Sequence, residues 1–119
     1  MIDHISLKVS DYERSKAFYA RALAPLGYSQ VMEHGRACGF GPGKPMFWIV
    51  EGEPTTPIHI AFGTEDRAVV DAFHAAALEA GGKDNGGPGL RPHYHPSYYG
   101  AFVHDPDGHN IEAVCHKPG

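Results

Sequence analysis

The sequence has 119 residues, 42% of them hydrophobic, which is enough for one domain with a packed core. The formal net charge is −4 and there is no cluster of Lys or Arg, which argues against nucleic acid or a membrane surface as a partner and favours a small molecule or another protein. No segment approaches the roughly twenty apolar residues that cross a bilayer, and the N-terminus alternates where a signal peptide would be continuously apolar, so we expect a cytoplasmic protein.

The first half of the chain predicts a β-α-β-β-β unit. Residues 4–9 alternate between polar and apolar, which is typical of a half-buried strand. Ser10 and Asp11 are both good caps, and Ser10 with Glu13 fits a capping box, for a helix over Tyr12 to Leu23 that Pro25 and Gly27 end. Three short strands are expected after it, separated by glycine turns: 28–34, 36–40 and 45–51. Residues 52–57 are rich in Pro, Thr and Glu and predict a linker.

The second half predicts a similar unit. A strand over residues 58–62 is followed by Thr64, which can cap a helix that Gly81 and Gly82 end. A glycine-rich loop over 84–89 precedes two further strands, at 98–104 and 109–115. Asp105-Pro-Asp-Gly108 between these strands is a turn, because Pro suits its second position and Gly its last.

An internal duplication relates the two halves. Shifting the sequence by 55 residues superposes a set of identical residues without a gap, from the start of the strand to the end of the helix. They include His4 on His59, Ile5 on Ile60, Ala17 on Ala72, Phe18 on Phe73, Ala22 on Ala77, Leu23 on Leu78 and Gly27 on Gly82. His4 and His59 therefore occupy equivalent positions on the first strand of each unit.

Three side chains are candidate metal ligands. His4 and His59 are expected to point away from their helices. Alternation in the last strand places Glu112 on the face opposite to Ile111 and Ala113. If the helices lie outside curled sheets, the three share the inner face, and two histidines with one carboxylate suit a divalent first-row metal. The alternative is a satisfied polar network in an empty ligand cavity.

The remaining histidines and the cysteines receive simpler interpretations. The other histidines outside the 92–99 segment are expected on the surface: His34, His74, His104, His109 and His116. Cys38 and Cys115 lie in strand-like segments and are interpreted as buried structural thiols, with a single bridge between them left open.

Several motifs together resemble the vicinal oxygen chelate superfamily of glyoxalases, bleomycin resistance proteins and dioxygenases. They are Ile2-Asp-His-Ile-Ser-Leu-Lys-Val9, Phe18-Tyr19, His59-Ile-Ala-Phe62, Asp105-Pro-Asp-Gly108 and Asn110-Ile-Glu112. The resemblance covers the whole chain and implies an α+β fold. In that fold, two βαβββ modules, here about 1–52 and 57–117, form one domain with a cupped mixed sheet and the helices outside. It also implies a homodimer that binds a small molecule.

The resemblance implies a metal site with a different ligand set from that of glyoxalase I. His4, His59 and Glu112 match three of its four ligands and imply a divalent cation such as Zn, Ni, Fe or Mn. The fourth ligand, a glutamate on the last strand of the first module, is replaced by Trp48 or Ile49, and Glu51 stands only at the strand end.

This ligand set leaves several functions open. The first is lyase or isomerase chemistry on a small oxygen-rich substrate, with Glu112 as both ligand and catalytic base. The second is an extradiol-type dioxygenase or a thiol transferase. The third is a protein that sequesters a small molecule without metal, as bleomycin resistance members do.

Substrate contacts are expected from an aromatic segment and from two further rings. The segment over residues 92–99 holds His93, His95, Tyr98 and Tyr99 and suits a lid with stacking and proton-transfer groups. The alternative is a loop whose rings plug a sheet edge or a dimer contact. Trp48 is interpreted as a wall of the cavity, where the fourth ligand is missing, with core packing as its alternative, and Phe102 adds to the same wall.

Overall fold

A computed structural model describes residues 1–119 as two helices, a short 3-10 turn and nine strands. Both expected units are present, and the linker between them is irregular from Gly52 to Ile58. No helix is long and apolar enough to cross a bilayer. In chain order the elements are β1 (Ile5–Val9), α1 (Tyr12–Ala22), η1 (Ala24–Leu26), β2 (Ser29–His34), β3 (Ala37–Gly41), β4 (Phe47–Glu51), β5 (His59–Thr64), α2 (Arg67–Glu79), β6 (Lys83–Asp84), β7 (Gly89–Leu90), β8 (Tyr99–His104) and β9 (Asn110–Cys115).

The strands form two separate mixed sheets with the same plan. The first sheet has the order β1-β4-β3-β2, and the second has the order β5-β9-β8-β6, with β7 also paired to β8. In each sheet the first and last long strands pair in parallel, β1 with β4 and β5 with β9, whereas all other pairs are antiparallel. The shared plan agrees with the duplication, and it leaves β1 and β5 each with one unpaired edge.

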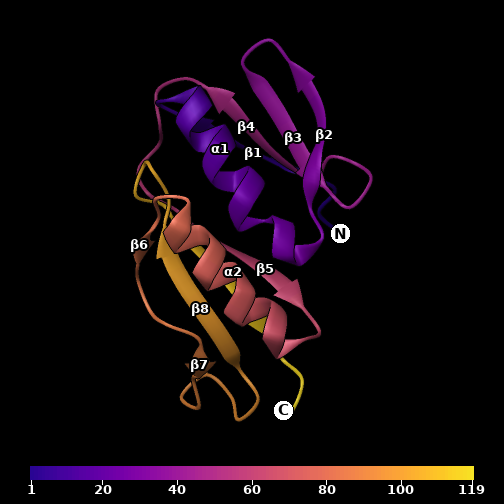
Figure 1. Ribbon diagram of the computed structural model, residues 1–119, viewed down its shortest axis with the longest axis vertical. Coiled ribbons are helices and arrows are strands. Elements are labelled where there is room, and N and C mark those ends of the chain that lie inside the picture. Colours follow the sequence, from indigo (N-terminus) through magenta and orange to yellow (C-terminus); the bar gives the residue numbers. More distant parts are fainter.

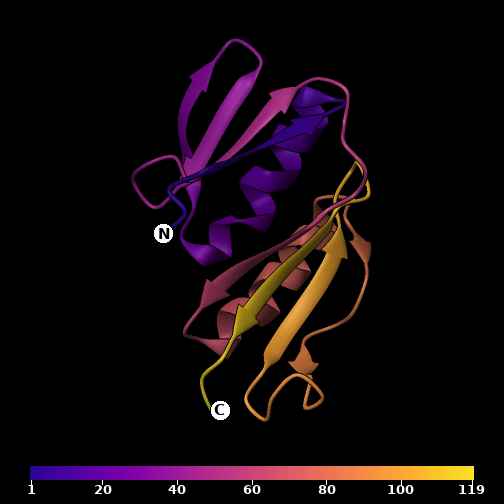
Figure 2. The same cartoon turned by 180° about the vertical axis from the view of Figure 1, so that it is seen from behind.

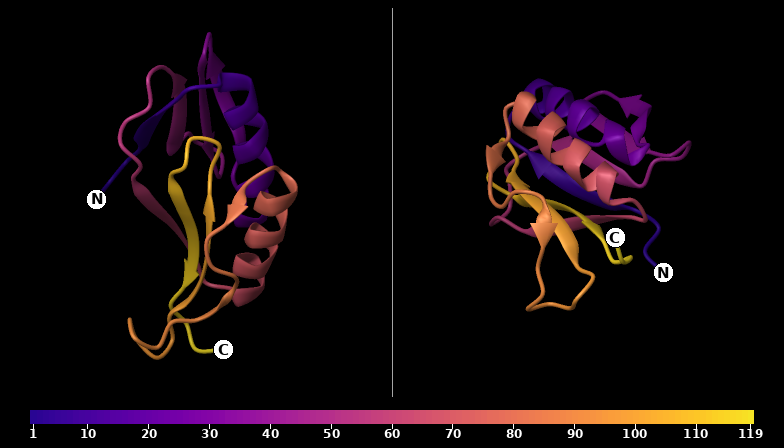
Figure 3. Two further views of the ribbon diagram at one scale, coloured as in Figure 1. Left: turned by 90° about the vertical axis from the view of Figure 1, so that its left-hand side faces the viewer. Right: turned by 60° about the horizontal axis from the view of Figure 1, so that its bottom comes forward.

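The molecule has two layers, because both helices lie on the same side of the two sheets (Figures 1 and 3). The core fills the space between these layers; Phe18 on α1, Ile49 on β4, Phe73 on α2 and Ile111 on β9 are completely buried there. The opposite faces of both sheets carry no helix, as the view from behind shows (Figure 2). Polar and aromatic side chains that point away from the helices therefore gather on two open sheet faces.

The Asp105 to Gly108 turn fastens the second module to the first. The Tyr19 hydroxyl donates to Asp105, and both the hydroxyl and the backbone N–H of Ser10 donate to Asp107. Gly108 has φ +87° and its N–H donates to the Asp105 carbonyl at 2.9 Å, as expected of this turn. Ser10 is thereby engaged elsewhere, so the predicted capping box is wrong. Asp11, the other expected cap, caps α1 by accepting from the Arg14 N–H at 3.2 Å.

A similar correction applies to α2, and two short strands were not foreseen. Asp66, and not Thr64, caps this helix by accepting from the Ala68 N–H at 2.9 Å. The glycine-rich segment also contributes β6 and β7, whose two-residue length is too short for a periodic signal. Cys38 and Cys115 are buried free thiols, as expected.

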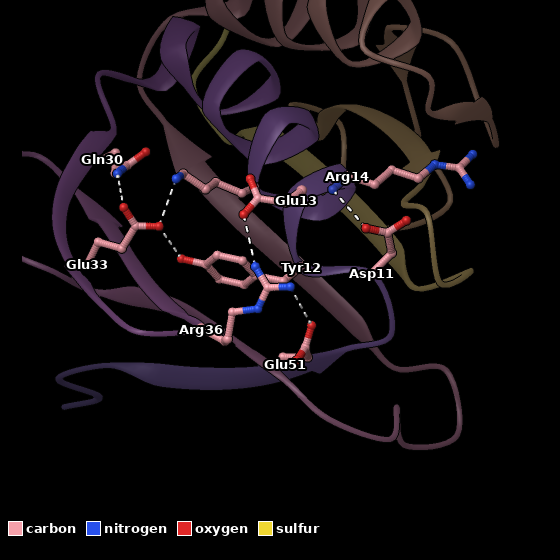
Figure 4. Close-up of polar contacts among 9 residues, drawn as sticks. Asp11, Tyr12, Glu13, Arg14, Gln30, Glu33, Arg36 and Glu51 are labelled. Atoms are coloured by element: carbon pink, nitrogen blue, oxygen red, sulfur yellow. Dashed lines mark hydrogen bonds and ion pairs between the residues drawn. The ribbon is translucent and has the colours of Figure 1, made fainter.

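A charged cluster ties α1 to the β2–β3 hairpin (Figure 4). The Glu33 carboxylate accepts from the Tyr12 hydroxyl and lies 2.7 Å from Lys16 Nζ. The Lys16 hydrogen bond, followed by that of Tyr12, holds the pKa of Glu33 below its usual range. Arg36 on the hairpin lies over the Tyr12 ring at 5.3 Å and reaches Glu51 at 3.4 Å. Glu51 therefore faces this cluster, which removes it as a substitute ligand.

Candidate functional site

Glu112 and His59 meet on the open face of the second sheet. Glu112 lies on β9 opposite Ala61 of β5, two residues after His59. His59 Nε2 is 2.7 Å from Glu112 Oε1. The Glu112 side chain is completely buried, whereas that of His59 is half exposed. Because no Lys or Arg pairs with Glu112, the imidazole is the only group that can balance its charge.

Tyr98 covers the second oxygen of this carboxylate. Its hydroxyl donates to Glu112 Oε2, so each carboxylate oxygen has its own partner. Burial, and then the hydrogen bond to Glu112, raise the pKa of Tyr98 well above its ordinary value. The phenol therefore stays protonated and acts as a donor at neutral pH.

A hollow of about 410 Å³ opens beside these groups. Its wall consists almost entirely of rings: His59, Tyr94, His95, Tyr98, Phe102 and His116, with Glu112 as the one acid. The loop over residues 91–98 closes one side, since the Arg91 N–H donates to the Tyr98 carbonyl at 2.8 Å. Such a wall suits a small planar or conjugated ligand held over a carboxylate.

A pair of histidines holds the loop against the end of β9. The Ser97 N–H donates to His95 Nδ1 at 3.1 Å, and His95 Nε2 is 2.8 Å from His116 Nδ1. Because His95 Nδ1 accepts, the proton of the neutral ring is on Nε2, which then donates to His116. The chain of bonds thus fixes the loop through two neutral imidazoles.

His4 lies in a different hollow, on the open face of the first sheet. This hollow of about 450 Å³ is lined by His4, Asp3, Lys44 and Trp48, among others. His4 Nδ1 is 2.8 Å from Asp3 Oδ1, and the imidazole is about half exposed. No group of three His, Cys, Asp or Glu side chains within the chain is arranged to hold a metal ion. One chain therefore brings His59 and Glu112 together but not His4.

Comparison with known proteins identifies the family. Residues 1–113 match the model of the Glyoxalase/Bleomycin resistance protein/Dioxygenase superfamily. The chain belongs to this superfamily. A glyoxalase/bleomycin resistance protein from Albidiferax ferrireducens is similar over 98% of each chain, with 30% identity and a TM-score of 0.83. No curated protein matches the sequence at a significant level.

Two more distant structures share the fold. A glyoxalase-related enzyme from Fulvimarina pelagi is 20% identical, with a TM-score of 0.73 over 97% of this chain and 87% of that one. The fosfomycin resistance protein FosX from Mesorhizobium loti is 21% identical, with the same TM-score over 98% and 92%. The two βαβββ modules expected from the superfamily resemblance are thus confirmed. The fold does not define the reaction, which has to be inferred from the residues of the site.

The structure distributes the expected substrate residues of this superfamily member over both faces. Trp48 lines the hollow of His4, because β4 buries Phe47 and Ile49 toward α1 and turns Trp48 outward. His95, Tyr98 and Phe102 line the hollow of Glu112. Phe102 therefore does not extend the wall that Trp48 forms within one chain.

Two of the expected residues lie outside both hollows. The Tyr99 hydroxyl donates to Asp71 of α2 at 2.6 Å, and Arg67 lies over its ring at 5.0 Å. Strand alternation causes this, since Tyr99 must face opposite to Tyr98 and Gly100. His93 is exposed and packs against Tyr94 at 4.2 Å between ring centroids.

Three histidine and tyrosine placements were missed from the sequence. His116 lines the hollow, which the phase of β9 could have indicated because 112, 114 and 116 share one face. Tyr94 reaches it through the loop conformation, for which no periodic signal exists. His109, expected on the surface, is completely buried because its Nδ1 accepts from the Ile58 N–H at 3.0 Å and so anchors the start of β5.

The donors at Glu112 fit part of a divalent metal site. One imidazole nitrogen and one carboxylate oxygen converge within 2.7 Å, and both atom types suit Zn, Ni, Fe or Mn. A buried carboxylate that lacks a Lys or Arg partner also fits a site that receives positive charge. Two protein ligands are fewer than such a site requires, and no third His, Cys, Asp or Glu side chain of the chain is arranged to complete it.

Proposed function

We propose that the protein is a metal-dependent, glyoxalase-like enzyme that performs lyase or isomerase chemistry on a small oxygen-rich substrate. The observation that carries this proposal is the completely buried Glu112, whose only ion-pair partner is His59 Nε2 at 2.7 Å, beside a hollow lined with rings. A buried carboxylate whose charge is balanced only by one imidazole is costly for stability, and such groups are typical of functional sites.

The third ligand in this proposal is His4 of a second copy of the chain. Both open sheet faces carry candidate residues: His4 and Trp48 on the first sheet, His59 and Glu112 on the second. A two-fold dimer that lays the first sheet of one copy over the second sheet of the other joins the two hollows. Two equivalent sites, each with His4, His59 and Glu112, then form between the subunits.

An apolar groove supports such a dimer. The unpaired edges of β1 and β5 border a groove of about 290 Å³, whose walls include Ile2, Ile5, Ile60 and Phe62. Ile2 is largely exposed in the single chain. Free strand edges next to exposed apolar side chains favour association, so a second copy is the natural cover for this groove.

In the joined site each residue has a defined task. A divalent cation, when bound, would supply Lewis-acid chemistry that stabilises negative charge on adjacent oxygen atoms of the substrate. Glu112 would hold this cation, since it is the one acid of the hollow. The wall formed by Tyr94, Phe102 and His116 excludes water and stacks on the substrate. Trp48 of the partner copy narrows the opposite side.

Metal loading of purified protein tests this proposal. Equilibrium dialysis with Zn²⁺, Ni²⁺, Mn²⁺ and Fe²⁺ should give about one ion per chain for one of them, and His59→Ala and Glu112→Gln should lower the affinity at least ~100-fold. His74→Ala is the matched control, because His74 Nε2 lies 2.9 Å from the Asp84 carboxylate in a similar pair at another surface. Its metal affinity should equal that of the wild type.

A negative result has a definite meaning. If the wild-type protein takes up none of these cations, the enzyme proposal is wrong. The ring-lined hollow then supports a protein that sequesters small molecules without metal.

A further inference from the structure

Tyr98 occupies one oxygen of Glu112 with a hydrogen bond. Its hydroxyl donates to Oε2, whereas Oε1 faces His59 Nε2 at 2.7 Å. The carboxylate is completely buried, so water does not compete for either oxygen. Each oxygen thus has a fixed and different environment.

The backbone of β8 is shaped around this contact. Gly100 is buried two residues after Tyr98, and a Cβ atom there would lie 3.1 Å from Glu112 Oε2 and 3.2 Å from Tyr98 Cε1. Both distances are tighter than ordinary contacts of a Cβ atom, so a side chain at position 100 would press on the phenol and on the carboxylate. Glycine at this position therefore leaves the space in which phenol and carboxylate meet.

The contact also connects the carboxylate to the loop. The Tyr98 N–H donates to the His95 carbonyl at 3.2 Å, and the Tyr98 carbonyl accepts from the Arg91 N–H at 2.8 Å. The Tyr98 ring packs edge-on against Tyr94 at 4.8 Å. A change in the position of Glu112 is thus transmitted to residues 91–98, and a change in this loop is transmitted to Glu112.

We propose that Tyr98 is a positioning residue that reserves Oε2 of Glu112, so that Glu112 binds the cation through Oε1 alone and cation binding orders the loop over residues 91–98. This inference rests on the proposed function, since it concerns the same site. Hydrogen bonds to a ligating carboxylate fix its orientation, and losing such a bond commonly weakens metal binding by about 10–100-fold. Loop order and cation affinity are coupled in both directions.

Tyr98→Phe tests the inference, with Tyr99→Phe as the matched control. The control removes the neighbouring phenol, which bonds to Asp71 of α2 instead. Titration with Co²⁺ should show affinity about 10–100-fold weaker for Tyr98→Phe and unchanged for Tyr99→Phe. The visible absorption of bound Co²⁺ should also change only in Tyr98→Phe, because a free Oε2 can join the metal and alter its coordination number.

Hydrogen exchange gives a readout that is independent of the bound ion's spectrum. Amides of residues 91–98 should gain protection when Co²⁺ binds to the wild type and to Tyr99→Phe, but not when it binds to Tyr98→Phe. If Tyr98→Phe does not fold, Gly100→Ala displaces the same contact while leaving the phenol in the chain. It should show the same loss of affinity and of loop protection.

The outcomes separate this inference from the proposed function. Binding of Co²⁺ by the wild type, with identical affinity, absorption and loop protection in Tyr98→Phe and Tyr99→Phe, overturns the role of Tyr98 and leaves the metal site standing. A wild-type protein that binds no Co²⁺ overturns both.

Discussion

Two buried carboxylates in this chain have opposite surroundings. Asp105 accepts hydrogen bonds from the Tyr19 hydroxyl and from the N–H groups of Asp107 and His109, all within the fold. The Glu112 carboxylate has hydrogen bonds only with Tyr98 and His59, both of which line the hollow. The first arrangement holds the two modules together, whereas the second leaves the charge of Glu112 with a single imidazole to balance it.

Neutral variants of these two acids should therefore differ in stability. Without metal, Glu112→Gln should leave the free energy of unfolding within about 1 kcal/mol of the wild type, because an uncompensated buried charge is removed. Asp105→Asn should lose about 1–3 kcal/mol, since the amide cannot accept all three bonds. Urea unfolding measures both values. A larger loss for Glu112→Gln than for Asp105→Asn would mean that Glu112 is mainly structural.

Trp48 leads to a prediction about substrate choice. It stands on the open face of β4, where glyoxalase I is expected to carry its fourth ligand, and Ile49 is buried on the other side. Methylglyoxal with glutathione should consequently be a poor substrate, with turnover at least ~100-fold below that of an efficient enzyme. An assay for lactoylglutathione with metal-loaded protein checks this. Rapid product formation would show that three ligands suffice for that reaction.

At the scale of elements, the sequence predicted the helices and long strands because their signals are local. Periodic apolar residues set α1 and α2, and glycine turns set the ends of the strands. The capping box of α1 failed because Ser10 donates to Asp107, which lies 97 residues away in the sequence. The burial of His109 was missed for a similar reason, since its partner Ile58 lies 51 residues away in the sequence.

The contact between α1 and the β2–β3 hairpin should give a pH signature. The pKa of Glu33 is lowered from its usual value near 4.5 by the hydrogen bonds from Lys16 and Tyr12. A carboxyl with a depressed folded pKa stabilises the fold above the unfolded value, and that contribution is lost as the pH falls through the folded value. Glu33→Gln should therefore be less stable than the wild type at neutral pH, and the difference should shrink below about pH 4.5.

Urea unfolding across this pH range checks the signature. Glu53→Gln is the control, because Glu53 is exposed in the linker and makes no ion pair. Its difference from the wild type should be small and independent of pH. A pH-independent difference for Glu33→Gln would contradict the assigned role of the cluster.

At the scale of the whole molecule, the internal duplication and the alternation of the strands predicted more about the position of the site residues than any single motif did. They placed His4, His59 and Glu112 on helix-free sheet faces, which the structure agrees with. They did not say which sheet lies over which, because that depends on contacts between surfaces and not on local periodicity. The single chain leaves its two faces apart, and the dimer we propose brings them together.

A mixed dimer tests this central claim most directly. His4→Ala and His59→Ala chains with different affinity tags are co-expressed, and the mixed dimer is isolated by purification on both tags in turn. One of its two sites then combines an intact His4 with the intact His59 and Glu112 of the other chain. Each variant alone should bind no cation, and the mixed dimer should bind about one cation per dimer. A mixed dimer that binds none, while the wild type binds about one per chain, would contradict a site shared between subunits.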